Sequence, residues 1–471
     1  MSTALGGKSL KQFAYLLAAQ WLRDGVQAVF LLLLARNSVE TYGNIMLAMG
    51  LGQILLFCSE FGINQHFMLL LASRSAAPSA VFRQITLLKA ALFTAGSLVM
   101  TGFCLWQGYP AGLLALVLII GLSFGLDALV NSYYVVCQSL GRQDVEGRLC
   151  GVAALLGYGA GILALFFGAG PLVTALFKPV ESLAALAGAF KMLCRSWRAA
   201  AQPLWSAVWA TWQGTLPFTL MALAAILYNK LNIFFLQRLG GAQAVAQYSA
   251  TWQLVDGISV LASGLLLGKV LFPVFAKLWV QDQAAFARRA RTHAAQLAAL
   301  ALPVMFVLAT GSEQIIGLLY GGQYAEAARV QPLLCLCVFF AFLHNLAYYL
   351  LLCMGRQMLV FWFFLAGLAV NAALCLLFMP TAPLDGAVWA IVGTKGFVAL
   401  LTVGACQRSL GLLTRRSVAL LLLSAAGAAA LTWAGREAGF VLAGELLALA
   451  LLLFHLWQYC KAQTPRVVAA C

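Results

Sequence analysis

Residues 111–143 read AGLLALVLIIGLSFGLDALVNSYYVVCQSLGRQ. Most of this stretch is one apolar run, and about twenty apolar residues are enough for a helix to cross the roughly 30 Å of hydrocarbon in a bilayer. Similar runs recur along the whole chain, in which 63% of the residues are hydrophobic and 9% are charged. Because soluble domains carry about a quarter charged residues, the sequence predicts an all-α polytopic membrane protein.

We count fourteen such runs in the sequence. They are predicted at residues 12–35, 42–72, 81–106, 111–138, 148–168, 171–192, 210–238, 246–273, 294–318, 331–353, 358–379, 385–406, 417–433 and 439–459. The longest polar stretch between them, at about residues 274–293, is too short for a soluble domain. Any function is therefore expected to reside in the membrane helices.

The lysines and arginines between the runs predict the orientation. If the amino terminus is cytoplasmic, the outer loops contain only Arg36, Arg238, Arg329 and Arg436, and all other basic loop residues face the cytoplasm. Basic loops are retained on the cytoplasmic side during insertion. We therefore expect a multi-pass protein of the cell (inner) membrane with both termini cytoplasmic. This asymmetry also explains most of the net charge of +15, so no nucleic-acid partner is expected.

Neither the cysteines nor any other motif indicates reaction chemistry. The twelve cysteines are scattered, and the one close pair, Cys335 and Cys337, lacks the spacing of a zinc site. No phosphate-binding loop, catalytic triad or pair of carboxylates stands out. We therefore expect no metal, no cofactor and no enzymatic activity.

The polar end of the quoted stretch occurs twice. Residues 133–143 read YYVVCQSLGRQ, and residues 348–357 read YYLLLCMGRQ. The copies end the fourth and the tenth predicted spans, and this offset of six spans means that both copies cross the membrane in the same direction, which indicates a parallel repeat. The sequence thus predicts two six-helix lobes, residues 1–200 and 201–410, followed by two further helices in residues 411–471. The glycine of each copy is expected to end its helix.

Six basic residues lie inside the apolar runs, where each charge costs about 2.5 to 3.5 kcal/mol at the centre of the membrane. They are Arg23, Lys89, Lys178, Lys230, Lys269 and Lys395. Lys89 and Lys269 lie within about two turns of a predicted cytoplasmic helix end, so we expect both to extend their long side chains to the interface. Lys178 lies two turns from an outer end, and either a structural or a functional role fits it.

Arg23, Lys230 and Lys395 lie deeper and predict a site for an anion, to which Lys178 is added as a candidate. Asp24 is expected to orient Arg23; the alternative is a mutually neutralised pair of Arg23 and Asp24 that only holds a helix in place.

Polar side chains follow one face of several predicted helices, because their spacing is three or four residues. These stripes predict a water-filled cavity shared by the two lobes. Its expected lining is Gln20, Gln27, Asn131, Tyr134, Asn229, Trp252, Gln253 and Asn345. Asp127 and Asp256 lie on two of these stripes and are candidates for binding a coupling proton or sodium ion; Asp256 also suits a structural counter-ion of a lysine.

Several short motifs resemble the polysaccharide-repeat (Wzx-type) flippases of the multidrug, oligosaccharidyl-lipid and polysaccharide exporter superfamily. They are Tyr228-Asn229-Lys230-Leu231-Asn232, Gly240-Gly241, Tyr248, Phe272-Pro273 and Leu384-Asp385-Gly386-Ala387. The helix count and the two lobes with two trailing helices also fit this family. Gln247 is a departure, since a small residue is expected before Tyr248.

The resemblance implies a transporter that moves a polyprenyl-diphosphate-linked oligosaccharide from the cytoplasmic to the outer leaflet by alternating access, for O-antigen or exopolysaccharide synthesis. It also implies the bilayer, a polymerase and glycosyltransferases as partners. Arg23 would be the main ligand of the diphosphate, because a guanidinium pairs two phosphate oxygens at once.

Three alternatives remain: a flippase for the peptidoglycan lipid precursor, a cation-coupled multidrug exporter and a non-transporting scaffold. The deep basic residues favour an anionic cargo over a cationic one.

Overall fold

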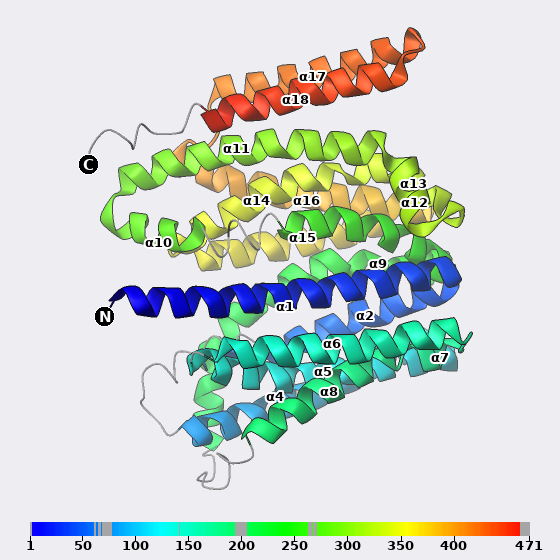
Figure 1. Cartoon of the computed structure of the whole chain (residues 1–471), viewed down its shortest axis with the longest axis vertical. Coiled ribbons are helices and arrows are strands. Elements are labelled where there is room, and N and C mark those ends of the chain that lie inside the picture. Colours follow the sequence, from blue (N-terminus) through cyan, green and yellow to red (C-terminus); the bar gives the residue numbers. More distant parts are fainter. Residues whose placement is uncertain are drawn as a thin grey trace. The chain divides into compact units, whose positions relative to one another are not determined.

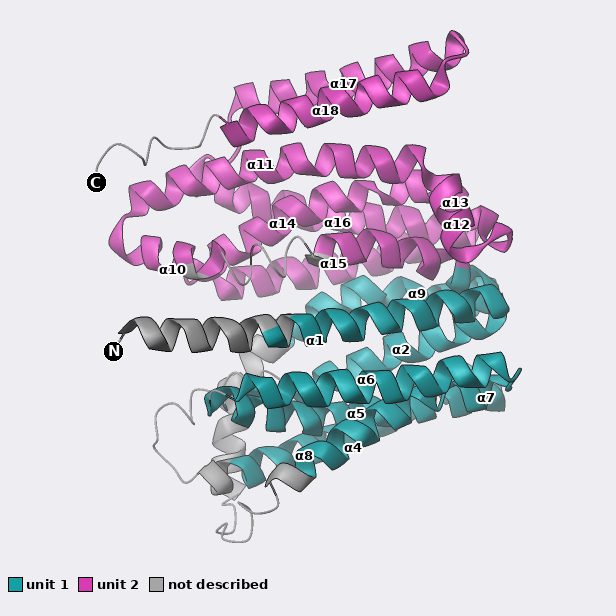
Figure 2. Cartoon of the chain, viewed as in Figure 1, with its two compact units in different colours: residues 1–246 teal, residues 247–471 magenta. Residues whose placement is uncertain are grey.

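The computed structural model describes residues 2–60, 63, 64, 67, 78–140, 142–193, 205–261, 267 and 271–461. The described residues form helices and short connections without any strand (Figure 1), which confirms the all-α prediction. The chain divides into two compact units, Met1–Ala246 and Gln247–Cys471 (Figure 2). This division follows packing, whereas the predicted lobes follow a repeat, so the lobe boundaries at residues 200 and 410 stay a prediction.

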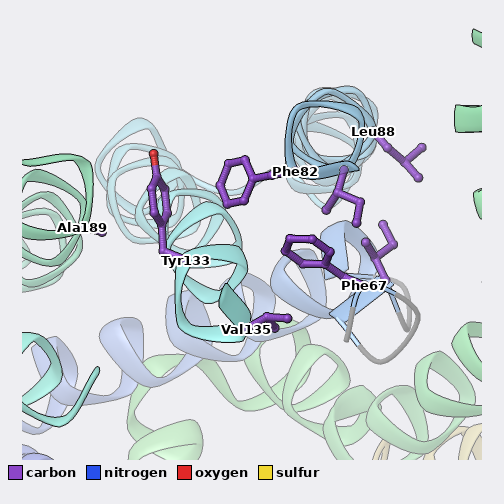
Figure 3. Packing of buried hydrophobic residues seen from close by; sticks show 8 residues of the cluster. Phe67, Phe82, Leu88, Tyr133, Val135 and Ala189 are labelled. Atoms are coloured by element: carbon purple, nitrogen blue, oxygen red, sulfur yellow. The ribbon is translucent and has the colours of Figure 1, made fainter. Parts of the chain in front are cut away.

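Unit 1 is a bundle of long helices. They are α1 (Ser2–Asn37), α2 (Val39–Glu60), α4 (Pro78–Trp106), α5 (Ala111–Ser139), α6 (Gln143–Phe166), α7 (Pro171–Thr174), α8 (Phe177–Leu193) and the first part of α9 (Trp205–Leu261). Helix α6 packs against both α1 and α8, and α5 packs against α2 and α8. Figure 3 shows part of the core, where the ring of Phe82 on α4 makes edge contacts with Phe67 and with Tyr133 on α5. The bundle thereby places polar side chains of α1, α2, α4, α5 and α8 next to one another.

Unit 2 begins in the second part of α9, which bends at Gly241, where the backbone is non-helical with φ 69°. Its other helices are α10 (Phe272–Gln281), α11 (Gln283–Thr310), α12 (Ser312–Tyr320), the 3-10 helix η2 (Gly322–Tyr324), α13 (Ala325–Leu334), α14 (Leu336–Cys353), α15 (Gln357–Phe378), α16 (Pro383–Leu410), α17 (Arg415–Glu437) and α18 (Val441–Lys461). Helices α17 and α18 form a hairpin whose α18 packs on α11 (Figure 1). They are the two trailing helices expected from the sequence.

Twelve helical segments of the described chain are long and apolar enough to cross a membrane. One of them, Leu220–Ser259, has 40 residues and is divided by the bend at Gly241. Helix α1, with 36 residues, contains the predicted first span at residues 12–35 as well. The protein is therefore a multi-pass membrane protein, and the predicted number of fourteen spans is approximate.

Three predicted boundaries differ from the structure. The polar stretch at 274–293 is not a loop but an elbow between α10 and α11, where the Asp282 side chain accepts a hydrogen bond of 2.8 Å from the backbone N–H of Ala285. This side chain caps α11, which therefore begins at Gln283, before the predicted span at 294–318. The span at 171–192 is broken before α8, whose first turn contains Pro179. The span at 331–353 is broken at Cys335, just after Pro332.

Both copies of the repeat end a helix in the same way. The backbone N–H of Arg142 donates to the carbonyl of Cys137 at 2.8 Å, and that of Arg356 donates to Leu351 at 2.9 Å. Each bond spans five residues, as in the Schellman ending of a helix, and Gly355 has the left-handed φ of 71° that this ending requires. The predicted role of Gly355 is confirmed, while Gly141 lies outside the described residues.

The motif Leu384-Asp385-Gly386-Ala387 has a structural explanation in unit 2. Arg329 on α13 donates to both carboxylate oxygens of Asp385, at 2.8 and 2.9 Å, and also bonds Glu326. These hydrogen bonds raise the pKa of Arg329, so its guanidinium stays charged. A β-carbon on Gly386 would lie 2.6 Å from the carbonyl carbon of Phe378. The motif therefore ties the start of α16 to its neighbours.

A first prediction concerns Gly43, where α2 approaches α9 closely. A β-carbon on Gly43 would lie 1.9 Å from the carbonyl oxygen of Ala242, and backbone has little room to shift. Gly43→Ala should lower the free energy of unfolding by about 1 to 3 kcal/mol, the usual cost of overpacking. Thermal unfolding of purified protein in detergent measures the effect. Gly50→Ala on the same helix is the matched control, because no atom of another described helix lies within 4 Å of its added β-carbon. Equal stability of the two variants would contradict the close approach.

Candidate functional site

Arg23 is anchored by one edge of its guanidinium. The side chain comes from α1 and is 32% exposed, and its Nε atom donates to Oε1 of Glu181 on α8 at 3.0 Å. Within the described residues, no acceptor bonds the two terminal nitrogens of Arg23. Those nitrogens form the fork that pairs two oxygens of a carboxylate or phosphate. The geometry thus fixes the guanidinium while leaving its anion-binding edge available.

Lys178 is the centre of a buried ion-pair cluster. Its side chain on α8 is 2% exposed, and its Nζ atom lies 2.6 Å from Oδ2 of Asp127 on α5 and 2.7 Å from Oε2 of Glu181. It also lies 4.7 Å above the ring of Phe124. Asp127 accepts a further hydrogen bond of 2.6 Å from Ser182. The two cations are thereby balanced by two carboxylates, and the four side chains come from α1, α5 and α8.

Three members of this cluster, Arg23, Asp127 and Glu181, line a cavity of about 100 Å³ inside unit 1. Arg23, Asp127, Asn131, Tyr134 and Glu181 supply its polar lining. A water molecule takes about 30 Å³ of liquid volume, so the cavity has room for a few waters or a small ion. It is too small for a glycan, and an oligosaccharide therefore requires a more open conformation than this one.

A second polar network corrects the expectation for Lys89. Its side chain is fully buried, and its Nζ atom donates to Oδ1 of Asn64 at 2.8 Å and to the carbonyl of Ala128 at 2.7 Å. Glu60 lies 3.9 Å from the same atom. The prediction that Lys89 reaches the interface is wrong, because oxygen atoms inside the bundle bind its ammonium group instead. Lys269 lies outside the described residues.

Asn131 joins the two networks. Its side-chain amide lines the cavity beside Arg23 and donates a 2.7 Å hydrogen bond to Oε1 of Glu60. Asn64 donates to the same oxygen at 3.0 Å. The two networks therefore meet on α5, where Asp127 and Asn131 both line the cavity.

Asp24 does not orient Arg23. The Asp24 side chain is exposed and accepts a 3.0 Å hydrogen bond from Gln20 on the same face of α1. Successive residues of a helix point about 100° apart, so Asp24 cannot share the inward direction of Arg23, and Glu181 takes the expected role. Gln27 also faces inward, where its Oε1 atom accepts a hydrogen bond of 3.1 Å from Tyr158.

The other predicted residues lie in two different places. Asn229 and Lys230 belong to the first part of α9, where the Asn229 amide donates to the carbonyl of Ala225 at 2.7 Å. In unit 2, the Nζ atom of Lys395 lies 5.5 Å above the ring of Trp252. The remaining candidates of unit 2 are partly buried: Gln253, Asp256 and Asn345. Arg23 and Lys230 belong to unit 1 and Lys395 to unit 2, and their convergence on one anion stays a prediction.

Glu181 and Glu60 were not identified as site residues from the sequence, although both complete the polar networks. The available signal was spacing: Lys178 and Glu181 are three residues apart, and residues at this separation are neighbours on a helix. For Glu60 the spacing of four residues to Asn64 was such a signal, but its other partners, Asn131 on α5 and Lys89 on α4, are distant in the sequence.

Comparison with known proteins adds a family and a fold. A family model described as "Polysaccharide biosynthesis protein" matches residues 33–329, which is more than half of the chain. No curated protein matches the sequence.

Solved structures of transporters resemble most of the chain. A structure of the lipid II flippase MurJ in an inward closed conformation has a TM-score of 0.71 at 11% identity, over 96% of this chain and 99% of that one. The structure of an inward-facing multidrug resistance MATE family transporter of the MOP superfamily has a TM-score of 0.63 at 13% identity. The match covers 83% of this chain and 94% of that one. The structure of a MOP superfamily transporter from Pyrococcus furiosus has a TM-score of 0.58 at 14% identity, over 86% of this chain and 96% of that one. At such identities the likeness shows a shared fold alone.

Proposed function

Because the chain belongs to the polysaccharide biosynthesis protein family, we propose that it is a flippase for a diphosphate-linked oligosaccharide lipid. It would carry this cargo from the cytoplasmic to the outer leaflet of the inner membrane, with both its termini cytoplasmic, for O-antigen or exopolysaccharide synthesis. The observation that carries the proposal is the Arg23 guanidinium, anchored through Nε while its terminal nitrogens stay available beside a membrane-embedded cavity.

Glu181 gives this site a means of exchange. With no cargo, its carboxylate balances both Arg23 and Lys178, which lowers the cost of holding two cations away from water. A diphosphate bound at the terminal nitrogens of Arg23 brings negative charge close to Glu181. Repulsion then weakens the bond between Glu181 and Arg23, while Lys178 retains the Glu181 carboxylate. The cargo thus replaces an internal anion, and the site need not hold an unpaired cation at any stage.

The glycan would rest on polar side chains of the lining such as Asn131 and Tyr134 once the two lobes rock apart, first toward the cytoplasm and then outward. For energy coupling, Asp127 and Asp256 would bind a proton or a sodium ion at one stage of the cycle. The Lys178 partner of Asp127 limits this role to a state in which that ion pair is broken.

A second prediction tests this coupling. Asp127→Asn combined with Asp256→Asn should abolish the stimulation of flipping by a proton or sodium gradient, because neither amide can bind the ion. Transfer of lipid-linked oligosaccharide in vesicles, measured with and without each gradient, gives the result. Full gradient-dependent activity in the double variant, or full wild-type activity without any gradient, would remove the coupling proposal.

Deletion of the gene in its host tests the proposed function. Surface polysaccharide should be lost, the lipid-linked repeat unit should accumulate in the cytoplasmic leaflet, and the cells should survive. Death with accumulated peptidoglycan precursor would favour the cargo of the MurJ flippase. Altered drug sensitivity with normal polysaccharide would favour a multidrug exporter such as the MATE transporters. Glycosyltransferase and polymerase genes beside this one would support the polysaccharide cargo.

A further inference from the structure

Unit 1 contains a second, apolar cavity that the ion-pair site does not use. It measures about 370 Å³ and lies between α2, α4 and the first part of α9. Leu55 and Cys58 of α2, Gly96 of α4, and Leu227 and Leu231 of α9 are among its lining residues. This volume is in the range of small-molecule sites, about 300 to 1,000 Å³. All three helices supply membrane-spanning segments, so the groove takes up hydrocarbon rather than water.

Gly96 keeps the groove open. A β-carbon at this position would lie 2.7 Å from Cδ1 of Leu55, and a larger side chain would occupy the space between the helices. Val99, one turn further along α4, also lines the groove and is 73% exposed. The groove therefore opens to the surrounding lipid, where a chain can enter sideways.

A positive charge borders this groove. Leu227, Leu231 and Phe234 of α9 line it, and Lys230 lies three residues after Leu227 and four before Phe234, at the edge of the same helix face. Lys230 is eleven residues before the bend at Gly241, where the first part of α9 ends. At 1.5 Å per residue, Lys230 lies roughly 16 Å from this helix end. This depth is about half of the hydrocarbon thickness.

Depth decides between two kinds of hydrocarbon ligand. The phosphate of an ordinary phospholipid stays at the membrane surface and cannot reach Lys230 while its acyl chain fills the groove. A diphosphate linker that is crossing the membrane does reach this depth, followed by its own chain. We propose that the groove binds the hydrocarbon chain of the lipid-linked cargo next to its diphosphate, during transfer. This inference rests on the proposed function and adds a path for the hydrocarbon chain of the cargo.

Cys58 provides a direct probe, because this thiol lines the groove and is partly buried. In the full-length protein in nanodiscs, polyprenyl diphosphate without any sugar should slow the reaction of Cys58 with a membrane-permeant maleimide at least about tenfold. The exposed thiol of Cys460 should react at the same rate throughout. Labelling is followed for each cysteine by peptide mass spectrometry. Equal protection by phosphatidylglycerol, or no protection by either lipid, would overturn the proposal.

Two glycine variants separate the groove from the flippase activity. Gly96→Leu should fill the groove and lower polyprenyl diphosphate binding and flipping about tenfold. Gly102→Leu on the same helix should not, since in the described part of the chain no neighbouring helix has an atom within 4 Å of its added β-carbon. Both variants are first compared in thermal stability. Normal flipping by a folded Gly96→Leu variant would overturn the proposed role of the groove and leave the proposed function standing. Protection of Cys58 in a wild-type protein that flips nothing would overturn the proposed function alone.

Discussion

Replacement of Arg23 by glutamine should reduce the flipping of lipid-linked oligosaccharide by about 10- to 100-fold, with the protein still folded in the membrane. Hydrogen bonds to a charged group contribute about 1.5 to 3 kcal/mol, and each 1.4 kcal/mol corresponds to a factor of about ten. Glutamine keeps a polar donor toward Glu181 but loses the forked, charged edge that would hold the diphosphate. Surface polysaccharide, quantified in a deletion strain that carries each variant, gives the measurement.

Two further variants make this result specific to the site. Arg23→Lys should be intermediate, because an ammonium group supplies the charge without the planar fork. Arg36→Gln removes the same charge from the last turn of the same helix and should leave transport unchanged. Normal polysaccharide with Arg23→Gln, or an equal loss with Arg36→Gln, would exclude Arg23 as the ligand of the cargo.

The second large effect is expected on folding. Lys178→Met should destabilise the protein by about 3 to 5 kcal/mol, because removal of one partner leaves a buried charge uncompensated. Glu181 retains Arg23, but Asp127 keeps only its hydrogen bond from Ser182 and its carboxylate remains 16% exposed. The amount of monodisperse protein extracted from membranes and its thermal unfolding in detergent should both fall.

A second substitution should reverse much of this loss. Asp127→Asn added to Lys178→Met removes the uncompensated charge, so the double variant should be more stable than Lys178→Met alone. Lys277→Met, at an exposed position of α10, is the control for the loss of a lysine and should be neutral. A Lys178→Met variant as stable as the wild type would show that the cluster does not hold α8 to α5.

Features that depend on local sequence were predictable. The copies at Tyr133 and Tyr348 indicated two equivalent helix ends, and the structure has the same hydrogen bond at Arg142 and Arg356. Hydropathy likewise predicted most membrane helices, because burial in lipid requires long apolar runs. The prolines were underestimated: Pro179 and Pro332 carry no N–H group and accompany breaks within two predicted spans.

The partners of the buried charges were less predictable, because they depend on the rotation and neighbours of each helix. Lys89 had a route to the interface in the sequence, yet Asn64, Ala128 and Glu60 surround it in the fold. Arg23 was expected to pair with its neighbour Asp24, although adjacent residues face different directions. Hydropathy predicts how deep a charged residue lies in the membrane, but it does not predict which neighbouring helix supplies its partner.

The most direct test of the account is flipping by the purified protein in lipid vesicles. A diphosphate-linked oligosaccharide lipid is placed in both leaflets, and a membrane-impermeant glycosidase trims every glycan that reaches the outside. Wild-type protein should expose the enclosed cargo to the enzyme, while Arg23→Gln should do so about 10- to 100-fold more slowly, in line with the loss of a charge-assisted contact. Trimming by the wild type that is no faster than in protein-free vesicles would contradict the central claim.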